Sequence, residues 1–582
     1  MGTCLSQGTL LENGWGPGRW HLAGRKNLTW EARPSVEHVT KPPVEFNLET
    51  DQRTEEGSEP DLKQGLVPGS EPGLEPGSEP GSEPGLESDS ELVPEPALEP
   101  ELVLGPKPPL DLTCEQWLLE ADGPVVPGGR NFSDEPVMIY EADLPPWFAA
   151  SEEELRSCDV ACRPILPNSE EAKNVTRWDA MTWQWPSGAP DRSHGFRVLR
   201  NMESAAYYPM LAVSEARKQG YDIIMTSELA SDIPLLYIGG SYFEPGLGFE
   251  EKVPAVAAAI SNCGGFSSRL EIIAKLREFG VEVHQYGRCN RTHEFPDEPP
   301  PPGMNEADAL AHRYLFYYAA ENSIYPDYVS EKFFRGLRVG TVPVYLGTAT
   351  AVDFAPAENA ILWLSGIEDV PRVAEEIKRL TNDRAAFEER LAWKTRGASD
   401  AFLALLSLNA FARSCVLCIH IATKLQEEAL AAPTLPELEI GTTAIGQADT
   451  SMEPVDGTRP CSCAEDVGFE GGKESGLQTV YHLYVRELNA FRYLDVFIRS
   501  TDLSIAGLEK AILARFQATD YAPVFVRYGF HNSRDGYKVF KVYPALTNQR
   551  RVLFEDGAFA SDDDFRKHLD SVPCPRLEVI FV

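Results

Sequence analysis

The sequence lacks any run of 18 consecutive apolar residues, so it predicts no transmembrane helix. Its first 24 residues are rich in glycine and contain no apolar stretch of the kind that forms the core of a signal peptide. Positive charge is also scarce, because 53 Lys and Arg residues stand against 89 Asp and Glu residues and leave a net charge of −36. A chain this acidic repels phosphate backbones, which argues against nucleic acid as a partner.

Patterns that bind metal ions are missing as well. No predicted strand ends in Asp-x-Asp, the arrangement that chelates a nucleotide through a divalent ion, and Asp327 and Asp353 are isolated. The ten histidines are scattered along the chain rather than paired at helical spacing. We therefore expect no bound metal and no required cofactor, with any stimulation by Mn²⁺ a secondary effect.

Two segments are too polar to form a core. Residues 51–105 contain 15 acidic and 2 basic residues, a net charge of −13, and within them residues 71–87 repeat with a four-residue Glu-Pro-Gly period. We expect an extended, disordered stalk inside an N-terminal region, 1–135, because so few apolar side chains cannot offset the entropy of folding. Residues 428–477, rich in Pro, Gly, Ser and acidic residues, are a predicted linker.

Residues 314–347 are the most informative stretch, because they predict a strand, a polar loop, a helix and a second strand in succession. The first strand, 314–320, is apolar and aromatic throughout, as expected for a strand buried on both faces. The helix has Asp327 as its expected N-cap and Gly340 as its end, and the second strand spans 341–346.

The polar loop between this strand and this helix is a candidate ligand site, because open α/β sheets bind ligands at the carboxyl ends of their strands. The first turn of a helix presents free N–H groups and a partial positive charge, which attract anions. Lys332 lies in or just after that turn and adds a full charge that suits a pyrophosphate. Glu331 beside it can accept two hydrogen bonds from the hydroxyls of a sugar. A surface ion pair on an ordinary helix is the alternative for these two residues.

A second strand–helix–strand unit, residues 254–287, precedes this one. Residues 254–260 are a continuous apolar run that predicts a buried strand, Gly280 ends the following helix, and the next strand begins at Val281. The apolar stripe of the predicted helix consists of Phe266, Leu270, Ile273 and Leu276. Two such units in one sheet form a nucleotide-binding α/β half.

Residues 478–582 form a separate predicted module at the C-terminus. The expected order is strand 494–499, helix 505–516, strands 524–528, 537–543 and 551–554, helix 562–569 and strand 576–582. This order is similar to a small β-grasp or PB1-like α+β roll. No catalytic cluster is visible in it, so we expect it to bind a protein partner or a glycan, or to mediate self-association.

The stretch 314–347 closely resembles the signature block of the α1,3-fucosyltransferases of glycosyltransferase family 10, which runs Y-K-F-x-x-x-x-E-N-S…D-Y-[VIT]-[ST]-E-K…G-[ST]-V-P-V-x-x-G. Leu315 stands where the family usually has lysine. A match of this length is far more specific than a short glycine-rich motif. The resemblance implies that four residues of this stretch hold GDP-fucose: Asn322, Tyr328, Glu331 and Lys332.

Three earlier segments resemble the same family. Residues 196–211 keep its Glu-Ser pair at Glu203, with Ala205 in place of the usual proline, and residues 221–237 resemble its Ser-Asp-Ile-Pro segment. Residues 254–289 resemble the strand, turn and arginine-bearing helix of its donor domain. This last segment places three residues on family positions: Ser261, Asn262 and Arg269.

The resemblance covers about 150–420 and implies an α/β fold of the GT-B type, with two Rossmann-like lobes facing each other across a cleft. It implies a first, acceptor-side lobe at 136–250 and a GDP-fucose-binding lobe at 251–427.

The resemblance also implies a mechanism in which an acceptor hydroxyl attacks fucose C1 as GDP leaves from the opposite face. Glu203 is the expected general base, since it matches the family's glutamate in the first lobe. Arg269 and Lys332 are expected to hold the pyrophosphate, and Glu331 to bond the hydroxyls of fucose or ribose. Glu321 either contributes to the donor site or holds the loop.

The function that this resemblance implies is inverting transfer of L-fucose from GDP-fucose, in α1,3 linkage, to GlcNAc of a glycoprotein glycan, either an N-glycan core or an antenna. Residues 178–195, where family acceptor loops vary, lack the paired histidines of enzymes that make Lewis-type antigens, which favours the N-glycan core. The alternative is a catalytically inactive scaffold that binds a nucleotide sugar or glycan and acts through its C-terminal module.

The cysteines bear on the cellular compartment. The family has a Cys-x-x-Cys after its catalytic unit, usually oxidised in a lumenal enzyme, and this resemblance implies a disulfide between Cys415 and Cys418. Two further pairings are open, Cys158 with Cys162 and Cys263 with Cys289, and the total of 11 cysteines leaves at least one thiol free. By the same resemblance we expect a lumen-facing, membrane-associated enzyme of the Golgi.

Overall fold

The computed structural model describes most of the chain from residue 106 onward and two strands before it. The described residues are 18–22, 28–32, 106–109, 111–120, 130–143, 150–175, 177–186, 195–431, 460–466, 476–519, 521–524 and 536–582. The chain divides into two compact units, Met1–Ala97 and Leu98–Val582. In the first unit, β1 (Gly18–Leu22) pairs antiparallel with β2 (Leu28–Ala32). The predicted stalk lies outside the described residues.

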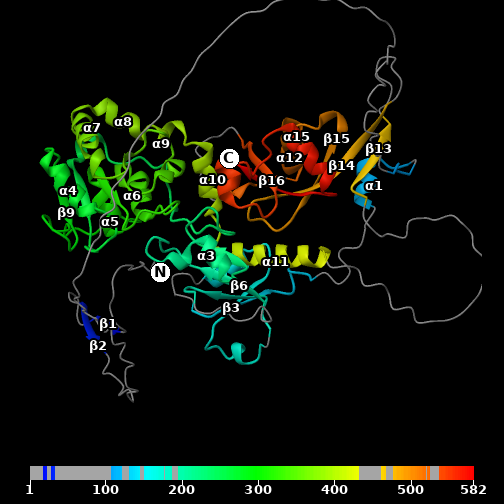
Figure 1. The fold of residues 1–582 in the computed structure, drawn as a ribbon, viewed down its shortest axis with the longest axis horizontal. Coiled ribbons are helices and arrows are strands. Elements are labelled where there is room, and N and C mark those ends of the chain that lie inside the picture. Colours follow the sequence, from blue (N-terminus) through cyan, green and yellow to red (C-terminus); the bar gives the residue numbers. More distant parts are fainter. Residues whose placement is uncertain are drawn as a thin grey trace, which may run out of the picture. The chain divides into compact units, whose positions relative to one another are not determined.

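In the second unit, a five-stranded parallel sheet forms the first lobe (Figure 1). Its strands are β3 (Val137–Glu141), β4 (Cys162–Ile165), β5 (Ala180–Trp183), β6 (Phe196–Arg200) and β7 (Ile223–Met225). Apolar side chains on both faces of this sheet are buried, so both faces need cover. Helix α3 (Val213–Lys218) packs on one face and α11 (Arg413–Ala431) on the other.

A second five-stranded parallel sheet forms the second lobe. Its strands are β8 (Val253–Ala259), β9 (Val283–Tyr286), β10 (Tyr314–Ala320), β11 (Val342–Leu346) and β12 (Leu362–Leu364). One face is covered by α4 (Arg269–Glu278), α7 (Val370–Asn382) and α8 (Arg384–Leu391). The other face is covered by α5 (Glu306–His312) and α6 (Glu331–Val339).

Strand β10 shows why this sheet is buried on both sides. All seven of its residues are buried, and from Phe316 onward successive side chains alternate between the two apolar clusters that flank the sheet. Tyr317 and Ala319 pack toward α5 and α6, whereas Phe316 and Tyr318 pack toward α4 and α7. The predicted strands of this signature stretch and the helix between them are confirmed.

The two sheets share one topology. The first has the order β4-β3-β5-β6-β7 and the second β9-β8-β10-β11-β12. In each sheet the second strand of the chain lies on one side of the first strand and the third strand on the other, so the direction of the crossovers reverses between the first and third strands. Ligands bind at such switch points, beyond the carboxyl ends of the strands. The predicted α/β fold with two Rossmann-like lobes is confirmed, and in the second lobe the switch point lies between β8 and β10.

Helix α4 is shorter than the sequence predicts. It begins at Arg269, so Phe266 lies in the preceding loop with 71% of its side chain exposed. The buried positions of the helix are Arg269, Ile272, Ile273 and Leu276. The prediction that Phe266 belongs to the apolar stripe of this helix was therefore wrong. A disulfide at Cys263 and two glycines hold the segment before the helix as a loop.

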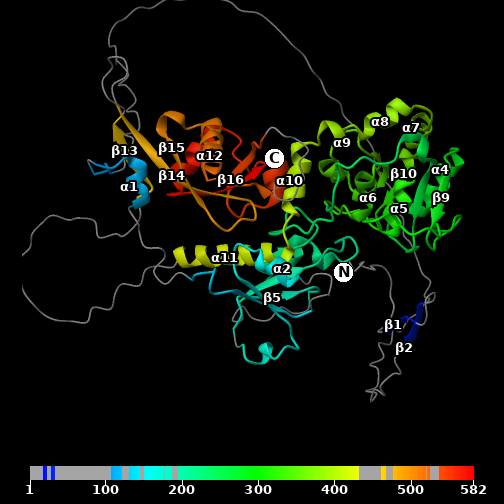
Figure 2. The ribbon, with the colours of Figure 1, turned by 180° about the vertical axis from the view of Figure 1, so that it is seen from behind.

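The end of the second lobe returns to the first. After α9 (Trp393–Arg396) and α10 (Asp400–Leu408), helix α11 runs beside the first sheet, as the views in Figure 1 and Figure 2 both show. Among the described residues no helix alone has the length and apolar character to span a membrane, while α10 and α11, bent by 86°, meet that standard only as a pair.

Short 3-10 turns connect several elements: η2 (Glu171–Lys173), η4 (Pro209–Leu211), η5 (Phe249–Glu251), η6 (Ala349–Phe354), η7 (Ile367–Asp369) and η8 (Ser500–Asp502).

The disulfide predicted within α11 was wrong. Cys415 pairs with Cys158 and Cys418 with Cys162, which also excludes a bond between Cys158 and Cys162. Both cysteines of α11 belong to the face that packs on the first lobe, where their partners lie in the loop after α2 (Glu152–Arg156) and at the start of β4. The predicted bond between Cys263 and Cys289 is confirmed, and the two remaining bonds join Cys114 to Cys463 and Cys461 to Cys574.

The C-terminal module is a five-stranded sheet with three described helices. Its strands are β13 (Ser462–Asp466), β14 (Leu477–Glu487), β15 (Leu494–Arg499), β16 (Val539–Pro544) and β17 (Arg576–Phe581). Its helices are α12 (Ile505–Ala518), α14 (Gln549–Phe554) and α15 (Asp562–Ser571). The disulfide from Cys114 joins α1 (Cys114–Glu120) to β13.

The sequence prediction for this module was partly wrong. The predicted strand 551–554 is helix α14, which Asn548 caps by accepting the backbone N–H of Arg551. The central strand β14 and strand β13 were not predicted, and most of the predicted strand 524–528 lies outside the described residues. The other predicted strands and both predicted helices are present.

The module shares a core with the second lobe. Tyr543, Leu553 and Ile580 belong to the same buried apolar cluster as Phe333 of α6 and Phe402 of α10. This packing makes the module an integral part of the unit that carries both lobes.

The observed pairing predicts that replacing Cys415 by Ser frees the thiol of Cys158 and leaves Cys418 bonded. The loss of a cross-link of this span should reduce the free energy of unfolding by about 2–5 kcal/mol. Peptide mapping without reductant, together with denaturant unfolding, measures both effects. A linked pair of cysteines within α11 in the wild-type protein would contradict the pairing.

Candidate functional site

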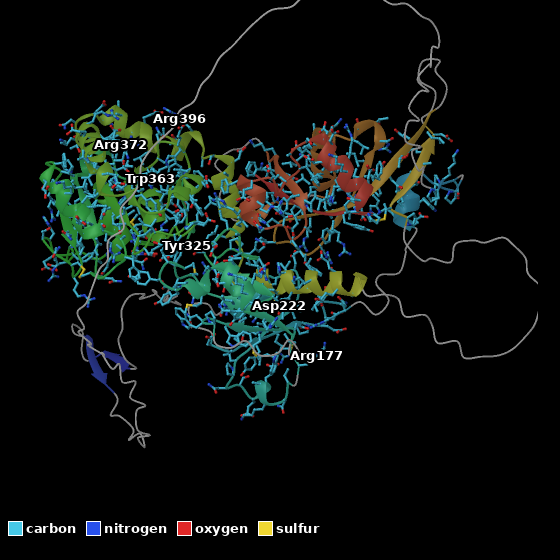
Figure 3. All side chains as sticks on the ribbon, viewed as in Figure 1. Arg177, Asp222, Tyr325, Trp363, Arg372 and Arg396 are labelled. Carbon is cyan, nitrogen blue, oxygen red and sulfur yellow. A yellow bond between two sulfur atoms is a disulfide. The ribbon has the colours of Figure 1, made fainter. Side chains whose placement is uncertain are left out.

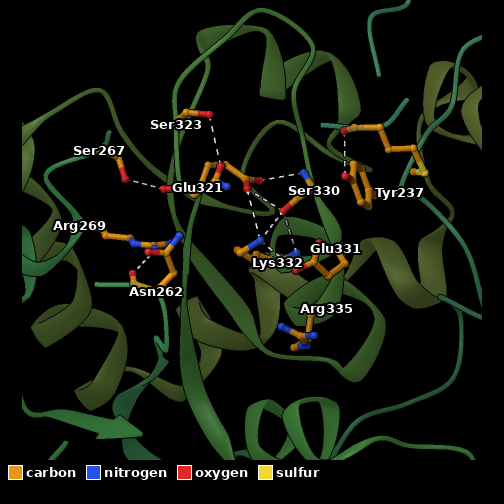
Figure 4. Close-up of polar contacts among 12 residues, drawn as sticks. Tyr237, Asn262, Ser267, Arg269, Glu321, Ser323, Ser330, Glu331, Lys332 and Arg335 are labelled. Carbon is orange, nitrogen blue, oxygen red and sulfur yellow. Dashed lines mark hydrogen bonds and ion pairs between the residues drawn. The ribbon is translucent and has the colours of Figure 1, made fainter. Parts of the chain in front are cut away.

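The residues singled out from the sequence come together at the switch point of the second sheet. The loop after β8 carries Ser261, Asn262 and the start of α4, and the loop after β10 leads to the start of α6 (Figure 4). Gly265 lets these two loops meet, because a Cβ at this position would lie 2.9 Å from the carbonyl oxygen of Asn322 and 3.4 Å from Cζ of Arg269.

Helix α6 begins one turn later than the sequence predicts. Its N-cap is Ser330, whose hydroxyl accepts the backbone N–H of Lys332 at 3.4 Å. The prediction that Asp327 caps the helix was wrong, since Asp327 has a φ of +61° and its carboxylate bonds groups distant in the sequence. Ser330 therefore orients the first turn of α6, which presents Glu331 and Lys332.

Glu321 holds the loop that leads to this helix. Its fully buried carboxylate accepts the backbone N–H of Ser330 at 2.8 Å and the Ser330 hydroxyl at 2.6 Å. Burial raises the pKa of Glu321, and the positive charge of Lys332, 3.8 Å away, opposes that rise. These contacts correspond to the loop-holding role, one of the two roles that the sequence left open.

Glu331 and Lys332 form a half-buried ion pair with Nζ and Oε1 2.9 Å apart. Burial alone would raise the pKa of Glu331, but Lys332 outweighs it and lowers the value to about 2. Burial alone would lower the pKa of Lys332, but Glu331 and Glu321 outweigh it and raise the value. Both side chains are therefore charged at neutral pH.

Arg269, the first residue of α4, supplies a second cation. It is buried, and its guanidinium donates to the carbonyl oxygen of Asn262. Burial lowers the pKa of Arg269, although the value of an arginine starts so high that the group stays protonated at neutral pH. The hydroxyl of Ser267 donates to the carbonyl of Glu321 at 2.5 Å and so joins the loop before α4 to the loop before α6.

Ser261 and Asn262 contribute mainly through the main chain of their loop. The carbonyl oxygen of Ser261 accepts two N–H groups of Arg288, at 2.9 and 3.2 Å. The side chain of Asn262 is exposed and accepts the N–H of Gly264 at 3.1 Å, which tightens the turn.

Glu203 lies in the loop after β6, in the first lobe, within electrostatic range of the start of α6. Its backbone N–H donates to Oδ1 of Asn201 at 2.8 Å. The side chain is accessible to solvent, yet neighbouring atoms displace enough water to raise the pKa of its carboxyl. The charges of Lys332 and Glu331 also act on that pKa, the first lowering it and the second raising it. The two lobes therefore place charged groups within electrostatic range of each other.

Tyr237 is a member of this site that the sequence did not single out. Its hydroxyl donates to the carbonyl of Met202 at 2.9 Å, and its ring meets the buried ring of Tyr328 edge-on at 6.2 Å between centroids. Burial, followed by the charges of Glu331 and Glu203, raises the pKa of Tyr237 well above its usual value, so the phenol is neutral. Its match to the family's Ser-Asp-Ile-Pro-x-x-Tyr segment was the available signal.

Arg335 was also missed. It lies one turn beyond Glu331 on α6, at a spacing that places both side chains on one side of the helix. Its guanidinium donates to Asp308 and to the hydroxyl of Tyr317, each at 2.9 Å. Its charge helps to lower the pKa of Glu331, so it stabilises the ionised form of that carboxylate.

Aromatic side chains cluster beside Glu203. The ring of Tyr207 lies 4.3 Å from the exposed ring of Phe266, and its hydroxyl donates to the carbonyl of Gly264 at 3.3 Å. Tyr208 packs between Tyr207 and Trp185, with centroid distances of 6.0 and 4.7 Å. This aromatic cluster joins loops of both lobes next to the charged site.

The arrangement can bind a phosphate-bearing ligand and remove a proton. The N–H groups of α6, with Lys332 and Arg269, provide positive potential, while Glu203 provides a carboxylate from the other lobe. Within the described residues, no group of three or more His, Cys, Asp and Glu side chains is arranged to hold a metal ion.

Comparisons with known proteins find similarity to fucosyltransferases in each case. The model of the C-terminal part of glycosyltransferase family 10 (fucosyltransferase) matches residues 249–435. The chain is 31% identical over 484 residues to a putative fucosyltransferase-like protein of Arabidopsis thaliana, a match that covers 81% of each chain. It is also 31% identical over 162 residues to GDP-fucose protein O-fucosyltransferase 3 of Mus musculus, covering 27% of this chain and 34% of that protein. A solved α1,3-fucosyltransferase with GDP-fucose is similar over 52% of this chain and 92% of that chain, at 13% identity and a TM-score of 0.27.

The contacts of Ser330 predict that Ser330→Ala reduces the free energy of unfolding by about 1–3 kcal/mol, because the N-cap and the hydroxyl bond to Glu321 are lost while the backbone N–H bond remains. Glu321 has a raised folded-state pKa, so its ionisation destabilises the fold above its unfolded pKa. Losing the Ser330 hydroxyl enlarges that penalty, and the deficit should grow as pH rises from 4 to 8.

Denaturant unfolding at several pH values measures this effect. Ser399→Ala, which removes only the N-cap of α10, is the matched control and should show a smaller, pH-independent loss. Equal losses for both variants at every pH would contradict the role of Glu321.

Proposed function

This chain belongs to glycosyltransferase family 10, the fucosyltransferases, and from that premise we propose that it transfers L-fucose from GDP-fucose, with inversion and in α1,3 linkage, to GlcNAc of a glycoprotein glycan. The observation that carries the proposal is that Glu203 from one lobe lies within electrostatic range of Glu331 and Lys332 at the start of α6 in the other. A displacement at fucose C1 needs a base on one side and charge stabilisation on the other.

The donor pyrophosphate occupies the cationic side in this proposal. Arg269 and Lys332, with the partial positive charge at the start of α6, balance the charge that GDP gains as the bond between C1 and the β-phosphate oxygen breaks. Glu331 is ionised and half-buried, which suits hydrogen bonds to the hydroxyls of fucose or ribose. Asn322 and Tyr328 lie in the loop between β10 and α6 that leads to this pair.

Glu203 takes the proton of the acceptor hydroxyl as its oxygen bonds to C1. The raised pKa of its carboxyl makes it a stronger base than an ordinary surface glutamate. The charge of Lys332 opposes this rise by lowering the pKa of Glu203. A catalytically inactive scaffold would have no use for a carboxylate so placed.

The acceptor is proposed to be a pyranose, in an N-glycan core or antenna, that stacks on the aromatic cluster. Exposed rings such as Phe266 and Trp185 offer apolar surface of the kind that packs against the C–H face of a sugar. A protein hydroxyl is a second candidate acceptor, favoured by the similarity to GDP-fucose protein O-fucosyltransferase 3.

A lumen-facing place in the Golgi is part of the proposal. All ten cysteines that the structure describes are paired, in five disulfides. Disulfides of this kind form and persist in oxidising compartments, which supports a secretory route.

Replacing Glu203 by Gln should reduce kcat for transfer by about 10²–10⁴-fold, because the base is lost while the shape of the side chain is kept. Affinity for GDP should change little. GDP release from GDP-fucose by the full chain, with GlcNAc-terminated N-glycans or with Ser- and Thr-containing peptides, measures both transfer and acceptor class. Glu153→Gln, an exposed change in the first lobe, is the control.

The outcomes separate the hypotheses. Turnover with glycans that Glu203→Gln abolishes supports the proposal, and turnover only with peptides favours the protein hydroxyl. GDP binding without turnover on any acceptor would favour the inactive scaffold and would contradict the transferase.

Because protein cations are proposed to balance the pyrophosphate charge, removal of divalent ions with EDTA should lower the rate by less than about tenfold. Arg269→Ala should raise KM for GDP-fucose by about tenfold or more, since a charge-assisted bond to phosphate is lost. Initial rates with and without EDTA and Mn²⁺ measure the first effect. Complete and reversible loss of activity in EDTA would show that a metal ion is essential.

A further inference from the structure

We propose that Arg550, on α14 of the C-terminal module, is a positioning residue for the loop that binds the donor. The family model matches residues 249–435, so this module lies outside the matched region. The proposal rests on the transferase function above and adds to it: the module completes the donor site by fixing the loop between β10 and α6. The contacts around Asp327, which begins the Asp-Tyr-Val-Ser-Glu-Lys segment of that loop, carry the inference.

Asp327 is buried and bonded from three directions. Nη1 of Arg550 lies 3.0 Å from its Oδ1, the backbone N–H of Leu229 donates to its Oδ2 at 3.1 Å, and its own N–H donates to Thr350 at 2.9 Å. Asp327 is 6% exposed, so an unpaired carboxylate here would be costly. Arg550 supplies the full positive charge among these contacts.

Arg550 also binds both lobes. Its backbone N–H donates to the carbonyl oxygen of Leu229, in the first lobe, at 3.0 Å. Its guanidinium reaches Oδ2 of Asp353, on η6 of the second lobe, at 2.9 Å. One residue of the module therefore joins a first-lobe loop, the donor-binding loop and η6.

The conformation of the loop depends on these contacts. A φ of +61° is uncommon for a residue other than glycine, and it persists where surrounding contacts impose it. Tyr328 follows directly, and Ser330, which caps α6 and binds Glu321, comes two residues later. A relaxed Asp327 would therefore shift the first turn of α6, which presents Glu331 and Lys332.

The charged groups around Asp327 predict that the effect of losing Arg550 depends on pH. Asp327 faces Asp353 on η6, Glu228 after β7, Tyr325 in its own loop and Arg550 on α14 (Tyr325 is labelled in Figure 3). Burial raises the pKa of Asp327, and Arg550 is the largest opposing influence. Without Arg550 the pKa would rise further, and the unpaired carboxylate would disturb the loop most at neutral and alkaline pH.

The test compares Arg550→Ala with Arg551→Ala in the full chain. Arg551 lies on the same helix with an exposed side chain, so its removal changes the net charge equally without touching the loop. We expect Arg550→Ala to weaken GDP binding and raise KM for GDP-fucose by about tenfold or more, with a deficit that shrinks as pH falls from 8 to 5.5. Calorimetric GDP titration, initial rates and thermal unfolding are measured on the same samples.

Two further variants keep the test decisive. Arg550→Lys, which keeps the charge but not the forked geometry, should restore part of the affinity, and Asp327→Asn combined with Arg550→Ala should remove the pH dependence. If Arg550→Ala does not fold, Arg550→Lys decides. Wild-type GDP affinity in Arg550→Ala or, failing that, in Arg550→Lys, or an equal loss in Arg551→Ala, would overturn the proposal. GDP binding needs no acceptor, so this result stands apart from a failure of transfer by the wild-type protein.

Discussion

The buried carboxylate of Glu321 is the interaction on which the charged site depends. It sits at the carboxyl end of β10 and is fully enclosed, so it must be hydrogen-bonded to be tolerated there. Ser330 satisfies it with both an N–H and a hydroxyl, and the same hydroxyl caps α6. The need to satisfy one buried carboxyl group therefore fixes where α6 begins and how its first turn is presented.

The two lobes place complementary chemistry at one location because their topologies match. Each sheet reverses its crossover direction between its first and third strands, and in the second lobe both bounding loops carry site residues. Glu203 follows β6 in the first lobe, and its pKa depends on Lys332 and Glu331 of the second. Burial raises the pKa of Glu203, and the ion pair of α6 adjusts it, with Lys332 lowering the value and Glu331 raising it.

What the sequence could predict is what local patterns determine. The strand at 314–320 follows from a run of apolar residues, and the end of α6 follows from the glycine at position 340. The structure confirms both. Asp327 was mistaken for a helix cap because the rule considers only neighbours in sequence, whereas Arg550, 223 residues away, binds its carboxylate. The disulfide predicted for Cys415 was wrong for the same reason, since its actual partner, Cys158, lies 257 residues earlier in the chain.

The C-terminal module shows why a separable-looking segment can be part of the active unit. Its sequence has no counterpart in the signature of the family, yet Tyr543 and Ile580 share a buried cluster with Phe333 of α6. Removing it would expose apolar surface directly behind the helix that presents Glu331 and Lys332, and would leave Asp327 without its charge partner. An enzyme whose two half-sites lie in different lobes needs their spacing held, and here a shared core and a salt bridge from outside both lobes provide that constraint.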